Sequence, residues 1–151
     1  MDSLPSRQSV VTLQDITADN WEHISRLVVN RDQLALVPSN IHSLCEHQFV
    51  PGSVIRAVYA DKVPVGYIRV NVVQTQGLLQ CIMIDQKCQG LLFGTRALAL
   101  LKKELKDRGV VALAVHTKPF DVVVHKDDSP EHFFTGLGFQ SAEEHQLVCV
   151  L

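Results

Sequence analysis

Residues 80–98 hold the groups that could bind an anion. The apolar run 81–84 breaks at Asp85 into a polar turn, and Gly90 and Gly94 then precede a long amphipathic stretch. A strand, a glycine-bearing loop and a helix start, in that order, present backbone N–H groups to a phosphate. The helix dipole adds a partial positive charge at the same place. The pattern therefore predicts an anion-binding turn around the two glycines.

Two side chains near this turn could take part in chemistry. His116 follows the apolar run 110–115, where an imidazole could act as a base toward an ammonium group or as an acid. The structural alternative is a half-buried histidine that bonds a carbonyl. Cys88 directly precedes Gln89, and a helix N-terminus can lower the pKa of a thiol there, but we expect a packing role.

The remaining polar residues favour structural roles. We expect Asp85 to cap its own turn and Glu131 to interact with the dipole of the helix that it begins. Tyr59 and Tyr67 lie on predicted strands, where we expect them to pack. The seven histidines show no His or Cys pairing at ligand spacing, so we expect no metal site. The sequence also lacks the Gly-x-Ser-x-Gly elbow of a hydrolase.

Composition limits the class of protein. With 151 residues, 46% of them hydrophobic, the chain suits one domain with a sizeable core. A net charge of −2, from 14 basic and 16 acidic residues, gives no basic field for a nucleic acid. No apolar run approaches the roughly 20 residues of a membrane span, and scattered cysteines favour free thiols in a reducing compartment. We therefore expect a soluble, cytoplasmic protein that binds neither nucleic acid nor membrane.

The elements that position these residues follow from apolar periodicity. A flexible tail at residues 1–9 precedes a single domain over residues 10–151. Residues 117–128 are predicted to be a loop in which Val122–Val124 could pair with a sheet edge. The predicted strands are residues 10–13, 54–60, 65–73, 78–84, 110–115 and 146–151, and the predicted helices are residues 19–30, 41–48 and 95–106 and a short helix that Ser129 and Pro130 begin.

This order predicts an α/β domain, layered as in α+β proteins, with a mixed, mostly antiparallel central sheet and helices on both faces. The helix 95–106 makes strands 78–84 and 110–115 parallel neighbours. The strand 110–115 is apolar throughout, so we expect it to be central and covered on both faces. The last strand, 146–151, could add to the sheet of a second copy, which favours a homodimer.

Several stretches together resemble the GNAT acetyltransferase superfamily, in particular its spermine/spermidine acetyltransferase-like branch. The resemblance is carried by residues 16–21, 28–33, 37–40, 57–67, 83–94 and 129–139. It implies a GNAT-like fold over residues 10–151. It also implies that acetyl-CoA is the acetyl donor, that no metal is needed, and that the acceptor is the amine of a small, polyamine-like molecule.

The cofactor loop of that family has the pattern Arg/Gln-x-x-Gly-x-Gly/Ala. Gln89 and Gly94 match its first and last positions, and Leu92 replaces its central glycine. A leucine there can still offer its N–H, but its side chain must point away from the cofactor. The resemblance assigns the pantetheine arm to Ile82, Met83 and Ile84, and the pyrophosphate to Gln89, Gly90, Leu91, Leu92, Phe93, Gly94 and Thr95.

The resemblance also bears on three positions outside this loop. In the family a tyrosine four residues before a Gly-Phe pair protonates the leaving thiolate, and here that position is Phe134, which has no proton to give. General acid catalysis contributes about 10²- to 10⁴-fold, so its loss slows the chemistry without abolishing it. His116 lies near the place where a pair of parallel strands separates in family members. Glu46 lies in the segment that borders the acceptor site and could contact a cationic substrate.

Two hypotheses follow from these observations. The first is an acetyl-CoA-dependent N-acetyltransferase in which the amine attacks directly and His116 or a water takes its proton. The second, which Leu92 and Phe134 motivate, is a catalytically impaired GNAT-fold protein that binds CoA, a metabolite or a protein partner.

Overall fold

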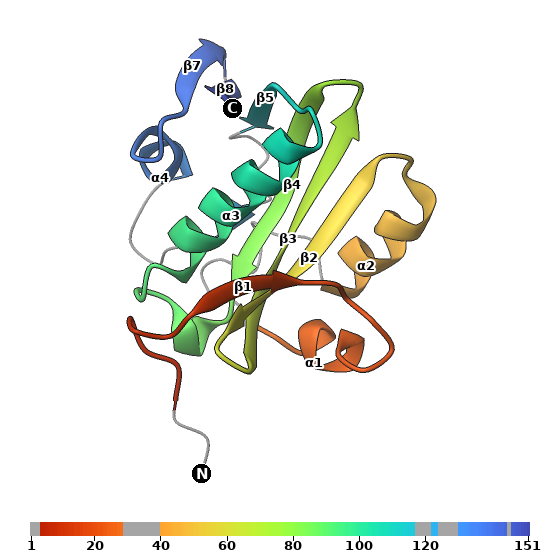
Figure 1. Cartoon of the computed structure of the whole chain (residues 1–151), viewed down its shortest axis with the longest axis vertical. Helices are drawn as coiled ribbons and strands as arrows, with labels where there is room; N and C mark the ends of the chain where they lie inside the picture. The colour runs from red at the N-terminus through yellow and green to blue at the C-terminus, as the bar shows by residue number, and fades with distance from the viewer. Residues whose placement is uncertain (1–3, 29–39, 117–121, 124–129, 145) are drawn as a thin grey trace.

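A computed structural model describes residues 4–28, 40–116, 122–123, 130–144 and 146–151 of the chain. Figure 1 shows its helices and strands. The strands are β1 (Val11–Gln14), β2 (Ser53–Ala60), β3 (Val63–Val73), β4 (Gln76–Ile84), β5 (Ala112–His116), β6 (Val122–Val123), β7 (Gln140–Glu143) and β8 (Gln146–Val150). The helices are α1 (Trp21–Ser25), α2 (Asn40–Phe49), α3 (Phe93–Asp107) and α4 (Pro130–Thr135), with a 3-10 turn, η2, at Gln86–Cys88.

The described strands form one eight-stranded sheet in the order β1-β2-β3-β4-β5-β8-β7, with β6 paired to β4 off this path. β4 runs parallel to β5 and to β6, and the other pairs are antiparallel. The predicted mixed, mostly antiparallel sheet is therefore confirmed. The parallel pairing that the crossover helix predicts between β4 and β5 is also present.

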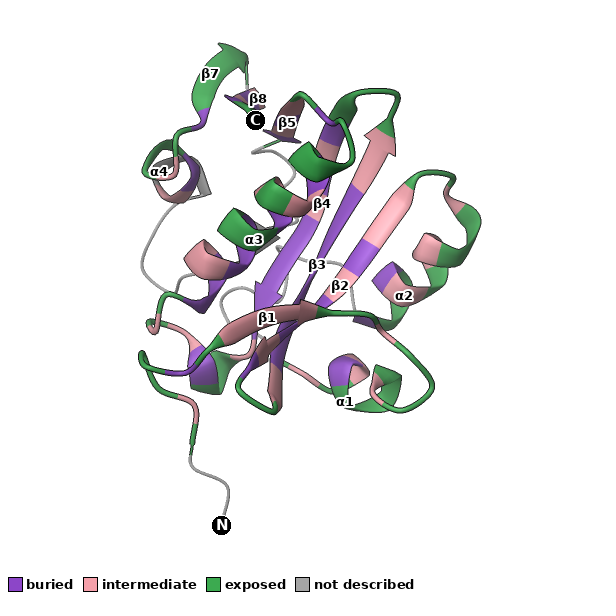
Figure 2. Cartoon of the chain, in the orientation of Figure 1, coloured by how far each residue is buried: buried purple, intermediate pink, exposed green. Residues whose placement is uncertain are grey.

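Two clusters of buried side chains show that helices cover both faces of the sheet. Leu98, Leu101 and Leu105 of α3 and Phe134 of α4 belong to the larger cluster with one face of the strands. Ile24 of α1 belongs to the smaller cluster on the other face, against which α2 also packs. Figure 2 shows α3 with its buried side toward the sheet and its exposed side outward. The layered arrangement predicted from the sequence is therefore confirmed.

The first helix is shorter than the predicted range 19–30, because tertiary hydrogen bonds compete for its last residues. The helix ends at Ser25. The Val28 N–H donates to a carboxylate oxygen of Asp85 (3.1 Å), and the Val28 carbonyl accepts from the Gln86 N–H (2.7 Å). These bonds hold the backbone of Val28 outside the helix. Residues 29 and 30 lie outside the described residues, as do Ser129 and Val124.

Three strand predictions need correction. β5 is central, but it is well covered on one face only, because Leu113 and Val115 are fully buried while Ala112 and Ala114 are half-buried. The last strand, β8, lies between β5 and β7, so both its edges are already paired and it cannot add to a second copy. β7 was not predicted, since its four residues are exposed and lack an apolar alternation. Because β8 has a neighbour on each side, the predicted homodimer has no support from strand addition at β8, and the homodimer itself stays a prediction.

Candidate functional site

A bulge in β4 opens the sheet beside β5. Arg69 of β3 faces Cys81, whereas the next residue, Val70, faces Leu79, so Gln80 is an extra residue in β4. A bulge bends its strand and ends regular pairing. The pairing of β4 with β5 indeed stops at Leu79 and Val115, and beyond that point the two strands diverge.

The distal half of β4 has a different neighbour on that edge. Ile82 and Met83, which were assigned to the pantetheine arm, pair instead with Val122 and Val123 of β6. This confirms the prediction that the run after residue 121 pairs with a sheet edge. Within the described residues this pairing covers two residues of β4.

The turn after β4 contains two residues in the left-handed region of backbone conformation. Gln89 closes the turn, since its side-chain amide donates to the Ile84 carbonyl (3.0 Å). Gly90 has φ +80°, and Leu92 has φ +65° and ψ +18°, which is the left-handed region. A residue with a Cβ costs about 1–2 kcal/mol there. The Leu92 side chain is 55% exposed, so it lies in solvent rather than in the core. That it points away from the cofactor stays a prediction.

Helix α3 begins at this turn with open backbone donors. Leu92 is its N-cap and makes no side-chain capping bond within the described chain, and the first intrahelical bond runs from the Arg96 N–H to the Leu92 carbonyl (3.1 Å). The N–H groups of Phe93, Gly94 and Thr95 therefore lack an intrahelical acceptor. The first turn carries no acidic residue that would occupy them. These donors and the helix dipole make a position for an anion.

Two arginines hold the carbonyl side of the turn. Arg96 donates to the Ser9 carbonyl (2.7 Å) and to the Leu91 carbonyl (3.4 Å), and Arg7 donates to the Gly90 carbonyl (3.4 Å). In a trans peptide the C=O and the following N–H point in opposite directions. The N–H groups of Leu91 and Leu92 therefore point away from both guanidinium groups.

The N-terminal residues contribute to this arrangement. Residues 6–9, which the sequence places in a flexible tail, form a turn in which the Ser9 N–H donates to the Ser6 carbonyl (3.0 Å). Ser9 is buried. Because Arg96 binds the Ser9 carbonyl, this turn is part of the frame behind the 89–92 backbone.

The predicted proton-transfer positions differ in environment. His116 is exposed and lies one residue past the last pair of β4 with β5, where the strands diverge. Phe134 is fully buried, with its ring centroid 5.1 Å from that of Phe133 and 5.2 Å from that of Phe139. The position at which the resemblance expects a tyrosine therefore holds a ring packed edge-on against two others. Glu131 lies in α4, but the structure does not describe its side chain.

The other polar residues near the turn mostly have structural roles. Burial, and next the charge of Asp85, raises the pKa of the Cys88 thiol, so this thiol is not activated. Asp85 was expected to cap its own turn, but its carboxylate instead holds Val28. The Tyr59 hydroxyl accepts from the side chain of Asn20 (3.1 Å). Among the described residues no group of three or more His, Cys, Asp or Glu could hold a metal.

A buried polar cluster lies between α2 and the sheet. The Tyr67 hydroxyl donates to the Ser43 hydroxyl (3.0 Å) and accepts from the Cys81 thiol (3.3 Å). Burial raises the pKa of Tyr67 far above its ordinary value, so its hydroxyl stays protonated. Arg69 donates from Nη2 to the Glu46 carboxylate (2.9 Å), whose same oxygen lies 3.5 Å from His42 Nε2.

Sequence reasoning missed Arg69, which is 2% exposed. The one feature of the sequence that could have indicated its role is that Arg69 is the single charged residue in the segment 63–73. Glu46, which we predicted to contact a cationic substrate, already contacts this buried cation. Of the predicted site residues, 89–95 lie in the turn and at the start of α3, and Glu46 lies in the cluster beneath α2. Residues 82–84 of β4, His116 at the end of β5 and the buried Phe134 belong to neither group.

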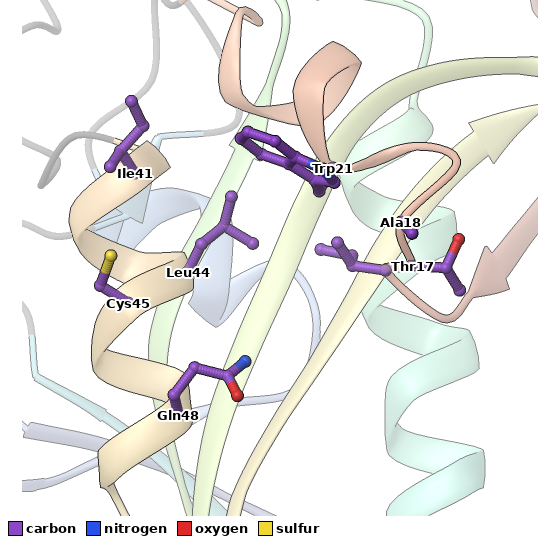
Figure 3. A pocket seen from close by; sticks show the side chains of 8 residues that line it. Thr17, Ala18, Trp21, Ile41, Leu44, Cys45 and Gln48 are labelled. Atoms are coloured by element: carbon purple, nitrogen blue, oxygen red, sulfur yellow. The ribbon is translucent and has the colours of Figure 1, made fainter.

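On its other flank, α2 forms an apolar pocket with the segment that leads into α1. Its volume is about 380 Å³, and Figure 3 shows Trp21 lying across from Leu44. The lining residues are Ile16, Thr17, Ala18, Trp21, Ile41, Leu44, Cys45 and Gln48.

None of the described helices has the length and apolar character that a bilayer crossing requires.

Comparison with known proteins gives the family and the fold. The sequence model of the acetyltransferase (GNAT) family matches residues 13–139. A comparison with curated proteins finds no match. Among solved structures, an acetyltransferase from Thermus thermophilus is 19% identical, with a TM-score of 0.72 over 93% of this chain and 97% of that one.

Two further structures share the fold at lower identity. The ribosomal-protein-S18-alanine N-acetyltransferase from Escherichia coli is 16% identical, with a TM-score of 0.69 over 93% of this chain and 94% of that one. The PaiA N-acetyltransferase from Thermoplasma acidophilum, in complex with coenzyme A, is 12% identical, with a TM-score of 0.61 over 92% and 96%. At these identities the likeness shows the fold alone.

Proposed function

The chain belongs to the acetyltransferase (GNAT) family, and from that premise we propose that it transfers an acetyl group from acetyl-CoA to the amine of a small molecule. The observation that carries the proposal is the turn at residues 89–92. Leu92 adopts the left-handed conformation at the position of the family's glycine, with its side chain toward solvent. The open N–H groups at the start of α3 then face the same position.

The proposed donor site uses backbone atoms. The N–H groups of residues 91–95 would bind the pyrophosphate of CoA, and the arginines behind the turn would keep the first two of these groups pointing outward. The PaiA structure, which contains coenzyme A, supports the choice of ligand. Arg7 and Arg96 also add positive charge near the phosphates without touching them.

The pantetheine arm needs an edge that β6 now uses. One edge of a strand can hold one partner, and β3 pairs with the other edge of β4. The amides of pantetheine could hydrogen-bond to the backbone of Ile82 and Met83 only after β6 has separated from this edge of β4. A parallel pairing of two residues is a weak competitor, so this displacement is compatible with binding.

The chemical step would depend on positioning rather than on a protein acid. The amine attacks the thioester carbonyl, and the proton that it releases passes to His116 or to water. The carbonyl is re-formed as the C–S bond breaks and the thiolate of CoA leaves. Phe134 provides no proton for that thiolate. A thiol of pKa about 8.5 nevertheless leaves unaided at a useful rate.

The second candidate is a protein of this family that binds CoA, a metabolite or a protein partner but does not catalyse transfer. The observation that favours it is Phe134, which lies fully buried among other aromatic rings where the family has its acid. A polyamine-like acceptor, which the resemblance implies, would also need a carboxylate that is free, whereas Glu46 is bound to Arg69.

An assay of thiol release separates these two candidates. The protein is mixed with acetyl-CoA and, in separate reactions, with polyamines, α-amino acids and other small amines. Release of free CoA that depends on both the protein and one amine supports the transferase. Binding of acetyl-CoA without release of thiol, over the whole panel, supports the second candidate instead.

A further inference from the structure

Arg69 is buried, and among the described residues most of its hydrogen-bond donors have no partner. Its side chain is 2% exposed and makes one hydrogen bond, from Nη2 to Glu46. Within the described part of the chain, Nε and Nη1 are buried and have no partner. A buried donor of a charged group that has no partner destabilises the folded state. The guanidinium group therefore has donors that could bond a further partner.

The partner of Arg69 can be displaced. Glu46 uses a single carboxylate oxygen, and its side chain is 38% exposed on α2. The cluster thus shows a carboxylate seated on the guanidinium group and reachable from solvent. A carboxylate that approached from solvent could exchange with it and engage two donors in place of one.

The position of Arg69 places this exchange beside the proposed chemistry. Arg69 is level with Cys81, the first residue after the bulge at which β4 leaves β5. Helix residues are spaced by about 100°, so His42 and Glu46 lie on the flank of α2 opposite the pocket residues Leu44 and Gln48. Figure 3 shows that pocket flank facing Thr17 and Trp21, which precede and begin α1. The flank of Glu46 therefore lies against the sheet, where Ser43 and Glu46 bond Tyr67 and Arg69 of β3 and His47 lies 2.7 Å from the Ser53 hydroxyl of β2.

The charges around Arg69 favour an anion. His47 lies close enough that its pKa is lowered, mainly by burial and next by the charge of Arg69, so its ring is neutral near pH 7. Tyr67 remains protonated. When Glu46 swings away, Arg69 is thus left as an uncompensated cation, which attracts a carboxylate and repels an ammonium group.

From these contacts we propose that Arg69 binds a carboxylate of the acceptor, in the place that Glu46 takes here. The inference rests on the proposed function and narrows its acceptor to amino acids and similar acidic amines, in place of polyamines. Arg69 is then a specificity-determining residue, and Glu46 is its internal substitute for the ligand.

The test compares Arg69→Lys and Glu46→Gln with the wild type. Lysine keeps the charge but loses the fork, so we expect the KM for an α-amino acid to rise by about tenfold, with the KM for acetyl-CoA unchanged. Glu46→Gln removes the competing carboxylate, so the same KM should fall by a few-fold. Arg56→Lys is the matched control, because Arg56 is a partly buried arginine that pairs with Glu104 of α3.

Several results would overturn this inference. If Glu46→Gln raises the KM for putrescine or spermidine and no α-amino acid is acetylated, then Glu46 is the partner of a cation. If Arg69→Lys and Arg56→Lys act alike on the amino-acid KM, then Arg69 is structural only.

A binding measurement keeps the inference testable without turnover. N-acetylglycine and N-acetylglutamate, as product probes, should raise the Tm of the wild type but not that of Arg69→Lys. The same rise in both proteins contradicts the role of Arg69, and so does no rise in either. Failure of acetyl-CoA to bind would count against the proposed function, whereas these product probes address Arg69 alone.

Discussion

In the turn at residues 89–92 the groups that face a ligand belong to the backbone, whereas in the cluster beneath α2 they belong to side chains. Where the resemblance expects a glycine, Leu92 has a left-handed conformation and its side chain lies in solvent. The cluster depends on particular atoms of Arg69 and Glu46. A site built from the backbone can therefore lose its motif and keep its geometry, but a site built from side chains cannot.

The largest expected effect comes from a tyrosine at position 134, where the resemblance places the family's acid. Phe134→Tyr should raise kcat by about 10- to 100-fold if a bound thioester opens the ring cluster to the new hydroxyl. The ring is fully buried, so a hydroxyl without a partner would also lower the free energy of unfolding by about 1–3 kcal/mol.

The measurement is kcat by thiol release, together with urea unfolding of both proteins. Phe133→Tyr, one residue away on the same short helix, is the control and should leave kcat unchanged. A kcat for Phe134→Tyr equal to that of the wild type, in a protein that turns over, would show that position 134 does not approach the thiolate.

The frame behind the turn is tested next. Arg96→Lys keeps a positive charge but cannot bridge the Ser9 and Leu91 carbonyls, so the Kd for CoA should rise by about tenfold. Arg108→Lys, at the other end of α3, should leave the Kd unchanged. An unchanged Kd for Arg96→Lys would mean that the turn keeps its shape without the arginine and that the charge alone matters.

A smaller effect tests the strain at Leu92. Leu92→Gly removes the cost of the left-handed conformation, and after the greater flexibility of unfolded glycine is subtracted we expect a gain of about 0.5–1 kcal/mol in stability. Leu100→Gly is the matched control on the exposed face of α3, where the same change should cost about 1 kcal/mol. Urea midpoints measure both, and equal losses would contradict the strained conformation of Leu92.

The smallest expected effect is a pH dependence of the folding stability that comes from His47 in the cluster beneath α2. Burial, followed by the charges of Arg69 and Arg56, lowers the pKa of His47 from its ordinary 6.5. The unfolded chain then binds a proton that the folded chain does not, so stability should fall as the pH falls through 6.5.

His47→Asn keeps a hydrogen-bonding group near Ser53 and should flatten that fall. His23→Asn, on the exposed face of α1, is the control. Identical pH profiles of unfolding for the wild type and His47→Asn would show that this environment does not perturb His47.

Much of the fold could be predicted because it depends on local patterns. Leu98, Leu101 and Leu105 recur at helical spacing and are the residues that α3 buries. Pro130 begins α4 as the sequence indicates. The early end of α1 could not be predicted, since it depends on hydrogen bonds between Val28 and a residue far along the chain.

The site was harder to predict for the same physical reason. The turn at residues 89–95 follows from adjacent residues and was found. The contact of Arg96 with Ser9 and that of Arg69 with Glu46 join distant segments. Arg69 becomes informative only once the register of β3 with β4 and the position of α2 are known.

A calorimetric titration with acetyl-CoA and CoA tests the central claim most directly. The account predicts saturable binding of both ligands at one site, weakened by Arg96→Lys and not by Arg108→Lys. No heat up to millimolar ligand, or binding that Arg96→Lys leaves unchanged while a phosphate-free pantetheine binds as tightly as CoA, would contradict the role of the 89–95 turn.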